Sequence, residues 1–549
     1  CFNDFPGHGP TIPPDDLEFY EPILDANNLL PFLDHLKDSR YRDLNNDGVP
    51  DSGGDQWSAD VFHTRDMVRQ AVADWMQLVR SLKACGEGKM TLEDGSEQLS
   101  CDWNNDGTID LGGPDAEFFI LGGSLGGINT GVAAALMPEV KAFSPIAGGA
   151  SLFDIALRTE IGGAVEAMHG RILSPMFLGY PNEDGSLRLV QMVNSERDMI
   201  ELDIATIPEI PPLGKIVVEN ITNGEVREGM IPEDGRFRLG LPCDAPTPSA
   251  KRKLVGMPAT GPSVGSVYEV ENNQGLGDLL SIKIYDQAGT LLHTVDTWEA
   301  EVVHEGVTMR AGSPLVAGSY GTGRIRGSSN LRRIVSIFGS VLESGDPIGY
   351  APRYFQRPIE VLGGKPTNIL MVPSIGDTIV PVSAGITMAR AAGLIPQDEV
   401  DDRYGMTVDE WLVDRRVIQG IEEYGEYRCP DENGDPCLFD ADDLDNGLDG
   451  TGAPSDEPLR LTLETEAGVS ALRLPYTSTR GSHGFGFAQP SQPGDQNSLA
   501  LNQIAYYFMS GGQEMSDDIC MADFSCDWIP ELDANTQTDD TTDTSDTGE

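Results

Sequence analysis

The sequence has little positive charge. Its 549 residues include 37 Lys and Arg against 88 Asp and Glu, which gives a formal net charge of -51. A chain this acidic repels phosphate backbones and anionic lipid surfaces, so we expect neither nucleic acid nor an anionic membrane surface as its main partner. The same charge suits an extracellular or high-salt setting and favours bound cations.

Long hydrophobic runs are also absent. No apolar stretch approaches the length of a membrane span, so we expect no transmembrane segment. The sequence begins with neither Met nor a signal peptide, from which we expect a processed or truncated chain. Hydrophobic residues still make up 39% of the total, enough for a sizeable core in one large domain with insertions or in two to three domains.

The eight cysteines show no Cys-x-x-Cys spacing, which argues against a zinc site. They fall partly into close pairs: Cys85 with Cys101, Cys429 with Cys437, and Cys520 with Cys526. Disulfides in an oxidising compartment are the better interpretation, and we expect a secreted or cell-surface protein. Cys1 and Cys243 are left over from these pairs. The alternative is a lipoprotein that is anchored through Cys1 as its lipidated first residue.

The strongest motif is Gly-x-Ser-x-Gly at residues 122–126. An apolar run at 118–121 precedes it, and residues 128–136 have the composition of a helix, so the pattern predicts a strand, a sharp turn and a helix. A serine at such a turn has strained backbone angles, and its hydroxyl stands out above the sheet. Ser124 is therefore a candidate nucleophile. The alternative is a tight structural turn in which the serine is incidental.

The backbone of this turn has its own requirements. Gly122 and Gly126 are expected because a Cβ at either position would collide with the neighbouring strand or helix. The N–H of Leu125 lies at the predicted helix start, where unpaired amides can hold a developing oxyanion. Leu125 is therefore the candidate oxyanion donor.

Two later residues are candidates for the acid and the base. Residues 368–372 have the composition of a buried strand, which leads into the loop that carries Asp377. Among the seven histidines, only His483 follows Asp377 in the chain, in a Gly-rich loop. The alternatives are an ordinary loop aspartate and an ordinary loop histidine.

Together these motifs resemble the α/β-hydrolase superfamily. The order Ser124, Asp377, His483 is that of the superfamily. Gly-Asp-x-x-Val-Pro at 376–381 is the sequence motif that usually surrounds the acid in this superfamily. The run Arg-Asp-x-x-Arg-Gln at 65–70 is similar to that of bacterial extracellular and virulence-factor lipases. The resemblance implies an α/β class, with an α/β-hydrolase sheet flanked by helices, and Ser124 as nucleophile, His483 as base and Asp377 as orienting acid. It also implies carboxylic esters, lipid esters among them, as substrates.

The opening Asp-Phe-Pro-Gly-His-Gly at residues 4–9 resembles a strand exit that lies two strands before the nucleophile strand of these hydrolases. We therefore expect the sequence to begin inside the hydrolase domain. Two other functions stay open. One is a peptidase or amidase on the same fold, and the other is a catalytically inactive, calcium-stabilised surface binding protein.

One acidic sequence motif, Asp-x-Asn-Asn-Asp-Gly-x-x-Asp-x-Gly-Gly, occurs twice, at residues 43–54 and 102–113. Oxygen ligands at its first, third and fifth positions, a Gly at the sixth and a carbonyl at the seventh can wrap a hard cation such as Ca²⁺. It resembles the calcium loops of EF-hands, dockerins and thrombospondin type 3 repeats, with Gly in place of the EF-hand Glu at position twelve. A solvated Asn/Asp/Gly turn is the alternative. The predicted ligands of structural Ca²⁺ are Asp43, Asn45, Asp47, Val49, Asp51, Asp55, Asp102, Asn104, Asp106, Thr108, Asp110 and Asp115.

Composition and pattern divide the chain into six segments. Period-two alternation with Asn-Gly and Gly turns indicates an inserted all-β domain in the middle, and we expect mostly helix before it, at 151–207. The expected segments are a first part of the hydrolase core with both calcium-type loops (1–212), the β-rich insertion (213–328), a cap helix and the strand with the acid (329–396), an acidic insertion (397–470), the histidine and a C-terminal helix (471–515), and a Cys-containing acidic tail that is disordered at its end (516–549).

Overall fold

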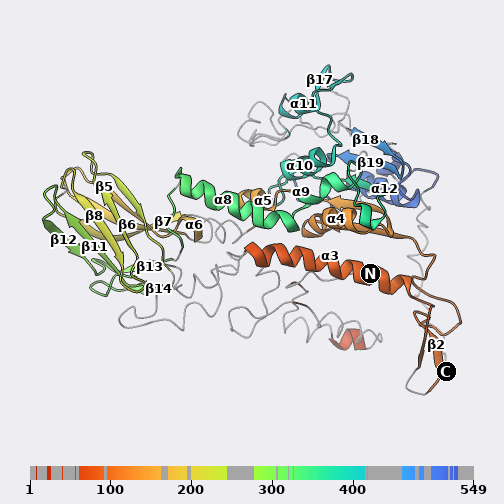
Figure 1. Cartoon of the computed structure of the whole chain (residues 1–549), viewed down its shortest axis with the longest axis horizontal. Coiled ribbons are helices and arrows are strands. Elements are labelled where there is room, and N and C mark those ends of the chain that lie inside the picture. The colour runs from red at the N-terminus through yellow and green to blue at the C-terminus, as the bar shows by residue number, and fades with distance from the viewer. Residues whose placement is uncertain are drawn as a thin grey trace, which may run out of the picture.

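The computed structural model describes residues 8, 21–25, 40, 56 and 61–528, with gaps at 92–94, 162–170, 195–198, 210, 244–276, 305–306, 320, 326, 415–416, 418–459, 477–480, 487–495, 517, 519 and 524. The described part mixes helices and sheets: helices surround a five-stranded sheet, and a second unit is all β (Figure 1). Within this part, no helix has both the length and the apolar character needed to cross a membrane.

The five-stranded sheet has the order β18-β19-β15-β4-β3. Its strands are β3 (Phe118–Gly123), β4 (Val140–Ile146), β15 (Asn368–Met371), β18 (Arg460–Thr465) and β19 (Gly468–Arg473). The strands β3, β4, β15 and β19 are parallel, and β18 pairs antiparallel with β19 at the edge. All residues of β15 are buried, as in the middle of a parallel sheet that is covered on both faces. The loops that follow the four parallel strands therefore meet at one edge of the sheet.

Helices cover both faces of this sheet. The helices that share the larger core are α3 (Val61–Lys83), α4 (Leu125–Leu136) and α10 (Val382–Ala392), whereas α12 (Gln496–Met509) packs in a second cluster. Because α4 connects the parallel neighbours β3 and β4, these elements form a βαβ unit. The strand, turn and helix predicted around the Gly-x-Ser-x-Gly motif are confirmed.

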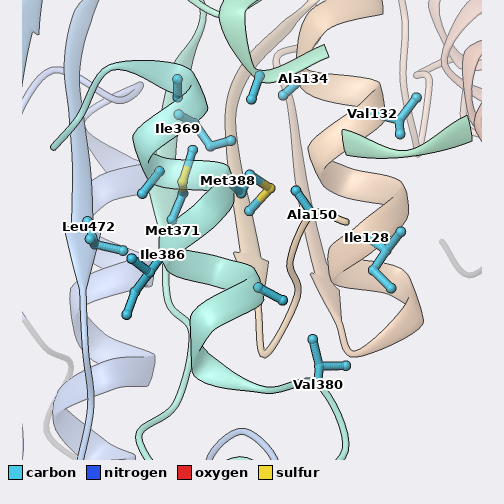
Figure 2. Packing of buried hydrophobic residues seen from close by; sticks show 14 of the residues in the cluster. Ile128, Val132, Ala134, Ala150, Ile369, Met371, Val380, Ile386, Met388 and Leu472 are labelled. Carbon is cyan, nitrogen blue, oxygen red and sulfur yellow. The ribbon is translucent and has the colours of Figure 1, made fainter. Parts of the chain in front are cut away.

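The larger core lies between the sheet and the helices α4 and α10 (Figure 2). Ile128 of α4, Met371 of β15 and Ile386 of α10 are buried there. Successive side chains of β15 point to opposite faces, so Leu370 joins the cluster with α12 instead. A one-residue slip would exchange the side chains of the two faces, and because each face packs in its own core, this packing fixes where the loop carrying Asp377 leaves the sheet.

The second unit consists of two four-stranded sheets, with the orders β10-β5-β6-β7 and β12-β11-β8-β9. The strands of both sheets pair antiparallel. Buried side chains from both sheets, with the fully buried Trp298, form a core of their own. The strands are β5 (Met176–Pro181), β6 (Leu187–Asn194), β7 (Met199–Ile207), β8 (Lys215–Asn220), β9 (Val226–Met230), β10 (Phe237–Gly240), β11 (Leu280–Tyr285) and β12 (Leu291–Val295).

This β unit begins at Met176, so the expectation of mostly helical structure over residues 151–207 is wrong. Helices in the described part of that segment are only α5 (Leu152–Arg158) and α6 (Arg171–Leu173), whereas β5, β6 and β7 precede the expected start of the β-rich insertion. The register of β6 against β7 shifts after Leu189. Such an irregularity interrupts the period of two and weakens the strand pattern in the sequence.

The segment predicted as a cap helix forms α8 (Ser329–Leu342), which packs against α3 and α5. Phe338 and Val341 on its apolar face join the larger core, whereas Ile337 is exposed. The short helix α9 (Pro347–Tyr350) follows and packs on α4. Figure 1 shows α8 between the β unit and the helices around the central sheet.

The remaining elements are short. Their strands form antiparallel pairs, β1 with β2, β13 with β14 and β16 with β17. The bounds are β1 (Lys89–Thr91), β2 (Glu97–Leu99), β13 (Val302–His304), β14 (Val307–Met309), β16 (Val400–Asp401), β17 (Met406–Thr407), α11 (Val408–Asp414), α13 (Cys520–Asp523), and the 3₁₀ turns η2 (Glu343–Gly345), η3 (Ala351–Arg353) and η4 (Glu360–Leu362).

Two of the three predicted disulfides are present. One joins Cys85 to Cys101, and the other joins Cys520 to Cys526. Cys243 is buried in the β unit. The third predicted pair, Cys429 with Cys437, and the proposed lipid anchor Cys1 lie outside the described residues.

Candidate active site

Ser124 occupies the sharp turn between β3 and α4. Its backbone angles are φ 56° and ψ -119°, a conformation that non-glycine residues rarely adopt and that costs about 1–3 kcal/mol. The N–H of Ser124 donates to the carbonyl of Ile146 at 2.9 Å, which holds the turn against the end of β4. The Ser124 side chain is half-buried and makes no capping bond to the helix. Its hydroxyl is therefore not used to stabilise the turn.

Close backbone approaches surround this turn, but not at both predicted glycines. A Cβ on Gly122 would collide with the carbonyl of Gly126, whereas a Cβ on Gly126 itself would meet open space. The tight position is instead Gly127, where a Cβ would lie 2.6 Å from the carbonyl oxygen of Ile146 and 2.9 Å from Cα of Gly148. The expectation for Gly126 is wrong because α4 leaves β3 at an angle that brings its second glycine, Gly127, against the end of β4.

Asp377 lies in the loop that follows β15, and its side chain has no exposed surface. Its Oδ1 accepts hydrogen bonds from the N–H groups of Ile379 at 2.8 Å and Val380 at 2.9 Å. These bonds fix the orientation of the carboxyl group. The burial and the two bonds distinguish Asp377 from an ordinary loop aspartate.

The structure brings His483 onto this carboxylate. The Nδ1 atom of His483 lies 2.8 Å from Oδ2 and 3.0 Å from Oδ1 of Asp377, across 106 residues of sequence. The histidine side chain is 29% exposed, so one end of the ring reaches solvent while the other is held by the acid. This is the arrangement in which a carboxylate selects the imidazole tautomer with its proton on Nδ1.

The loop that carries His483 packs on two other parts of the site. A Cβ on Gly481 would collide with the backbone of Gly376, so the histidine loop touches the acid loop. A Cβ on Gly484 would lie 3.6 Å from Cβ of Ala147, the residue directly after β4. These contacts bring the histidine loop to the end of β4, where the turn at Ser124 is also held.

Ser124 and His483 lie at the same edge of the sheet, but no hydrogen bond joins them in the part of the chain that the structure describes. The ring of His483 bonds there to Asp377 alone. In free enzymes, catalytic hydrogen bonds are often long and tighten only when substrate binds. His483 is thus paired with Asp377 and not with Ser124.

Leu125 begins α4 directly after Ser124. The first N–H groups of a helix have no partner within the helix, and they carry the partial positive charge of its dipole. Among the described residues, no hydrogen bond engages the N–H of Leu125. This N–H is therefore available to an oxyanion that forms beside the serine.

A buried carboxyl group, Asp346, holds the segment that follows β4. Its side chain accepts hydrogen bonds from the N–H groups of Ser151 at 2.8 Å, Leu152 at 2.5 Å and Ile348 at 2.9 Å. Burial raises the pKa of Asp346, and the three N–H bonds oppose that rise. The Asp-Pro pair in the sequence is a signal for a helix cap, but no local signal shows the contact with Ser151, which depends on the tertiary fold.

The second predicted calcium loop is a tight turn closed by its own polar groups. Asp102 is buried and accepts hydrogen bonds from the N–H groups of Asp106 at 3.1 Å and Gly107 at 3.0 Å. The side-chain amide of Asn104 lies 3.1 Å from the carboxylate of Asp106 and 3.2 Å from that of Asp110. Nδ2 of Asn104 donates to both carboxylates, and its Oδ1 accepts the N–H of Asp106 at 2.9 Å. The loop therefore brings the carboxylates of Asp106 and Asp110 to one side chain, and carboxylate oxygens are the hard donors that suit Ca²⁺.

Asp115, another predicted ligand, does not join this group. Asp115 is exposed and makes no hydrogen bond within the described residues. Thr108 donates its N–H to Asp106 at 2.7 Å, and this bond is the main reason why the pKa of Asp106 lies below its ordinary value. Where the structure is described, no three His, Cys, Asp or Glu side chains are arranged as a metal site. The ligands predicted in the first loop, Asp43, Asn45, Asp47, Val49, Asp51 and Asp55, lie outside the described residues.

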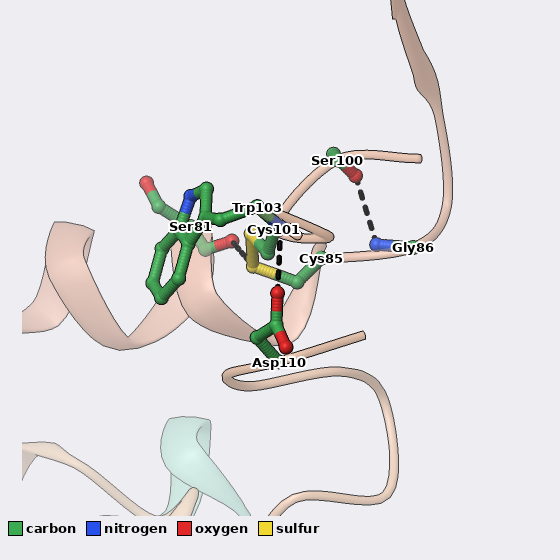
Figure 3. Close-up of a disulfide and its surroundings, with 7 residues drawn as sticks. All are labelled: Ser81, Cys85, Gly86, Ser100, Cys101, Trp103 and Asp110. Atoms are coloured by element: carbon green, nitrogen blue, oxygen red, sulfur yellow. Dashed lines mark hydrogen bonds between the residues drawn. A yellow bond between two sulfur atoms is a disulfide. The ribbon is translucent and has the colours of Figure 1, made fainter. Parts of the chain in front are cut away.

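The second loop is attached to the end of α3 by a disulfide (Figure 3). Cys85 and Cys101 have Cα atoms 5.5 Å apart, and Cys101 directly precedes the loop. Within the loop, Asp110 accepts the N–H of Trp103 at 2.6 Å. The loop is thus fixed between α3 and the chain that leads into β3, the strand before the nucleophile turn.

Known proteins offer no guide to this site. Comparison of the chain with protein-family models, with curated proteins and with solved structures gives no match. The functional argument therefore depends on the geometry of Ser124, Asp377 and His483 and on the chemistry of these three side chains.

Proposed function

We propose that this chain is a serine hydrolase of the lipase or esterase type, which cleaves carboxylic esters on an α/β-hydrolase fold. The observation that carries the proposal is the pairing of His483 with the buried Asp377 at the sheet edge where Ser124 holds a strained turn. A loop histidine and a loop aspartate that are 106 residues apart have no structural need to meet at this edge.

The order of the strands supports the same proposal. Ser124 follows β3, Asp377 follows β15, and His483 follows β19, all parallel members of one sheet. In α/β-hydrolases the nucleophile stands on a strand-to-helix turn, and the acid and the histidine come later in the chain in that order.

The proposed reaction has two steps, the acylation of Ser124 and the hydrolysis of the acyl-enzyme, and His483, Asp377 and the N–H of Leu125 act in both. With its Nδ1 proton held by Asp377, His483 has Nε2 free to take the proton of the Ser124 hydroxyl while Oγ attacks the ester carbonyl. The N–H of Leu125 donates to the oxyanion that forms. The bond to the alcohol then breaks, and Nε2 returns the proton to that alcohol. Water attacks the acyl-enzyme in the same way, with His483 as base, and releases the carboxylic acid and the free serine.

A second candidate function follows from one observation, the lack of a Ser124–His483 hydrogen bond within the described residues. A surface binding protein that retains the fold without catalysis would also show this separation. The peptidase or amidase alternative shares the triad with the esterase, so only substrates distinguish these two.

We also propose that the protein is secreted or displayed on a cell surface and that its second acidic loop binds structural Ca²⁺. Disulfides persist in oxidising compartments, and Cys85–Cys101 lies directly beside that loop. Asp102, Asn104, Asp106 and Asp110 would supply the oxygen ligands. Bound Ca²⁺ would relieve repulsion among the three carboxylates and stiffen the approach to β3.

Labelling with a fluorophosphonate probe tests the enzymatic proposal, because the probe reacts only with an activated serine. We expect an adduct on Ser124, located by peptide mass spectrometry, that disappears in Ser124→Ala and in His483→Ala. Ser336→Ala, a change on the exposed side of α8, is the control and should label like the wild type. An absence of adduct would favour the binding protein.

A substrate panel then separates the hydrolase classes. We expect turnover of p-nitrophenyl esters and not of the matching p-nitroanilides. Comparable turnover of the anilides would assign the site to a peptidase or amidase.

A further inference from the structure

The acidic loop at residues 102–113 is attached to α3 at both of its ends. At its start, the preceding residue Cys101 is joined to Cys85, which lies two residues after the end of α3 (Figure 3). At its end, the N–H of Gly113 donates to the carbonyl of Leu82, in the last turn of α3, at 2.8 Å. The whole loop therefore closes on the C-terminal end of one helix.

The backbone at this attachment is tightly packed. A Cβ on Gly112 would lie 2.3 Å from the carbonyl oxygen of Leu82 and 3.3 Å from Sγ of Cys85. A Cβ on Gly86 would likewise collide with the side chain of Ile109. The disulfide is therefore part of the surface against which the end of the loop packs, and its opening would loosen that contact.

The disulfide also borders the carboxylates of the loop. Asp102 follows Cys101 directly, is 2% exposed and accepts the N–H groups of Asp106 and Gly107. The N–H of Asp110 donates to the carbonyl of Cys101 at 2.9 Å, so this cysteine closes the base of the loop. Two of the proposed Ca²⁺ ligands, Asp102 and Asp110, are thus placed by the backbone of Cys101.

A cross-link at this position restricts the loop before any cation binds. The disulfide joins residues that are 16 apart in the sequence. A cross-link of this kind removes conformations mainly from the less ordered states of the chain. Once the disulfide is open, the loop has more conformations, and bound Ca²⁺ must order them at a cost in entropy. Ca²⁺ should therefore bind more tightly to the oxidised protein than to the reduced protein.

We propose that the Cys85–Cys101 disulfide and the Ca²⁺ site of this loop are coupled: the disulfide tightens Ca²⁺ binding, and bound Ca²⁺ protects the disulfide from reduction. Because coupling between two equilibria is reciprocal, both effects have the same factor. Such coupling typically amounts to about 5- to 150-fold, and we expect about tenfold. The inference rests on the proposed Ca²⁺ site and does not involve the triad.

The reduction is a two-electron reaction for which a dithiol supplies two electrons and two protons. One thiolate of the dithiol attacks a sulfur of the disulfide, the S–S bond breaks, and the second thiol of the reductant displaces the mixed disulfide. The products are the thiols of Cys85 and Cys101 and the cyclic disulfide of the reductant. The loop carboxylates repel an attacking thiolate, so neutralisation by Ca²⁺ would accelerate the attack. The test therefore measures the equilibrium and not the rate.

Equilibration of the wild-type protein at different ratios of reduced to oxidised dithiothreitol tests the coupling. The protein is held with saturating Ca²⁺ or with EDTA, its thiols are alkylated, and the peptides that contain Cys85 and Cys101 are quantified by mass spectrometry. With Ca²⁺ we expect half-reduction at about a tenfold higher ratio of reduced to oxidised reagent. Cys520–Cys526, which packs in a different hydrophobic cluster, is the matched control and should not shift.

Two substitutions assign the shift to this loop. Asp106→Asn removes the charge of a proposed ligand, and we expect it to abolish most of the shift in the reduction midpoint. Asp115→Asn changes an exposed carboxylate outside the ligand group and should retain the full shift.

The reverse effect is measured on Ca²⁺ affinity. The double variant Cys85→Ser, Cys101→Ser should bind Ca²⁺ about tenfold more weakly in calorimetric titration, whereas the double variant Cys520→Ser, Cys526→Ser should bind it as tightly as the wild type. The titration of Asp106→Asn gives the heat from any other Ca²⁺ site, which is subtracted.

Three outcomes would overturn the coupling, and they are distinguishable. If Asp106→Asn reduces the effect of EDTA on the melting temperature, yet the reduction midpoint is the same with and without Ca²⁺, the loop binds Ca²⁺ and the coupling is wrong. An equal shift of both disulfides would mean that Ca²⁺ stabilises the whole fold and not this contact. If neither the thermal effect depends on Asp106 nor the midpoint moves, the Ca²⁺ site itself is wrong, and so is the coupling.

Discussion

The Nδ1 atom of His483 lies 2.8 Å from Oδ2 of Asp377, a carboxylate whose side chain is wholly buried. Asparagine at this position keeps the shape but can present an N–H to the ring, which favours the wrong imidazole tautomer. We expect Asp377→Asn to lower kcat for ester hydrolysis by about 10⁴-fold, measured by steady-state kinetics. Asp409→Asn, on an exposed residue paired with Arg390, is the control and should leave kcat unchanged. A loss smaller than about tenfold would show that the pair does not act on the base.

The strain at Ser124 predicts a gain in stability when function is removed. Glycine adopts φ 56° without the steric cost that serine or alanine incurs. We therefore expect Ser124→Gly to be more stable than Ser124→Ala, with an unfolding free energy that is higher by roughly 1 kcal/mol. Differential scanning calorimetry should show this as a higher melting temperature. Both variants should lack hydrolysis. If the glycine variant were the less stable of the two, the turn would not be strained in solution.

The two glycines of the motif are expected to differ. Gly122→Ala places a Cβ against the carbonyl of Gly126, whereas Gly126→Ala places one in open space. We expect the first change to destabilise the protein by about 2 kcal/mol or more. Gly126→Ala should be close to neutral or slightly stabilising, because alanine favours a helix. Thermal unfolding of both variants measures this difference, and equal effects would contradict the geometry of the turn.

Calcium binding predicts a thermal shift that depends on one carboxylate. Removal of Ca²⁺ with EDTA should lower the melting temperature, since a ligand present at about 100 times its Kd stabilises the folded state by about 2.7 kcal/mol. Asp106→Asn should reduce this shift because it removes a charge from the predicted ligand group. Asp115→Asn changes an exposed carboxylate outside that group and should retain the full shift. An identical melting temperature with EDTA and with Ca²⁺ would contradict the proposal that the loop binds Ca²⁺.

Asp346 predicts a pH dependence of stability. Burial raises its pKa in the folded protein above the ordinary value of 3.8, so the folded state holds the proton more tightly than the unfolded chain. The resulting stabilisation is complete below that ordinary value and is lost as pH rises through the folded pKa.

The comparison that isolates this effect uses Asp346→Asn, which has no proton to exchange. As pH falls from 7 to about 4, the unfolding free energy of the wild type should rise relative to that of Asp346→Asn, measured by denaturant titration. The opposite trend would mean that the N–H bonds of Ser151, Leu152 and Ile348 outweigh the burial of the carboxylate.

Local patterns in the sequence were sufficient where neighbouring residues decide the structure. The apolar run, the glycines and the small residues around Ser124 define a strand, a turn and a helix because each of these depends on contacts within a few residues. Val68, Val72 and Val79, which are spaced as on one face of a helix, are likewise buried on α3. The spacing of Cys85 and Cys101 was also enough to predict their disulfide.

The tertiary structure alone decided the rest. No local signal shows that Gly127, and not Gly126, meets the end of β4, because that contact depends on the angle at which α4 leaves the sheet. Of the strands before residue 213 that escaped prediction, β6 and β7 are paired with a register shift that interrupts the alternation. The pairing of His483 with Asp377 required the chain to fold the two loops onto one edge of the sheet, since residues distant in sequence interact only through packing that is shared by the whole domain.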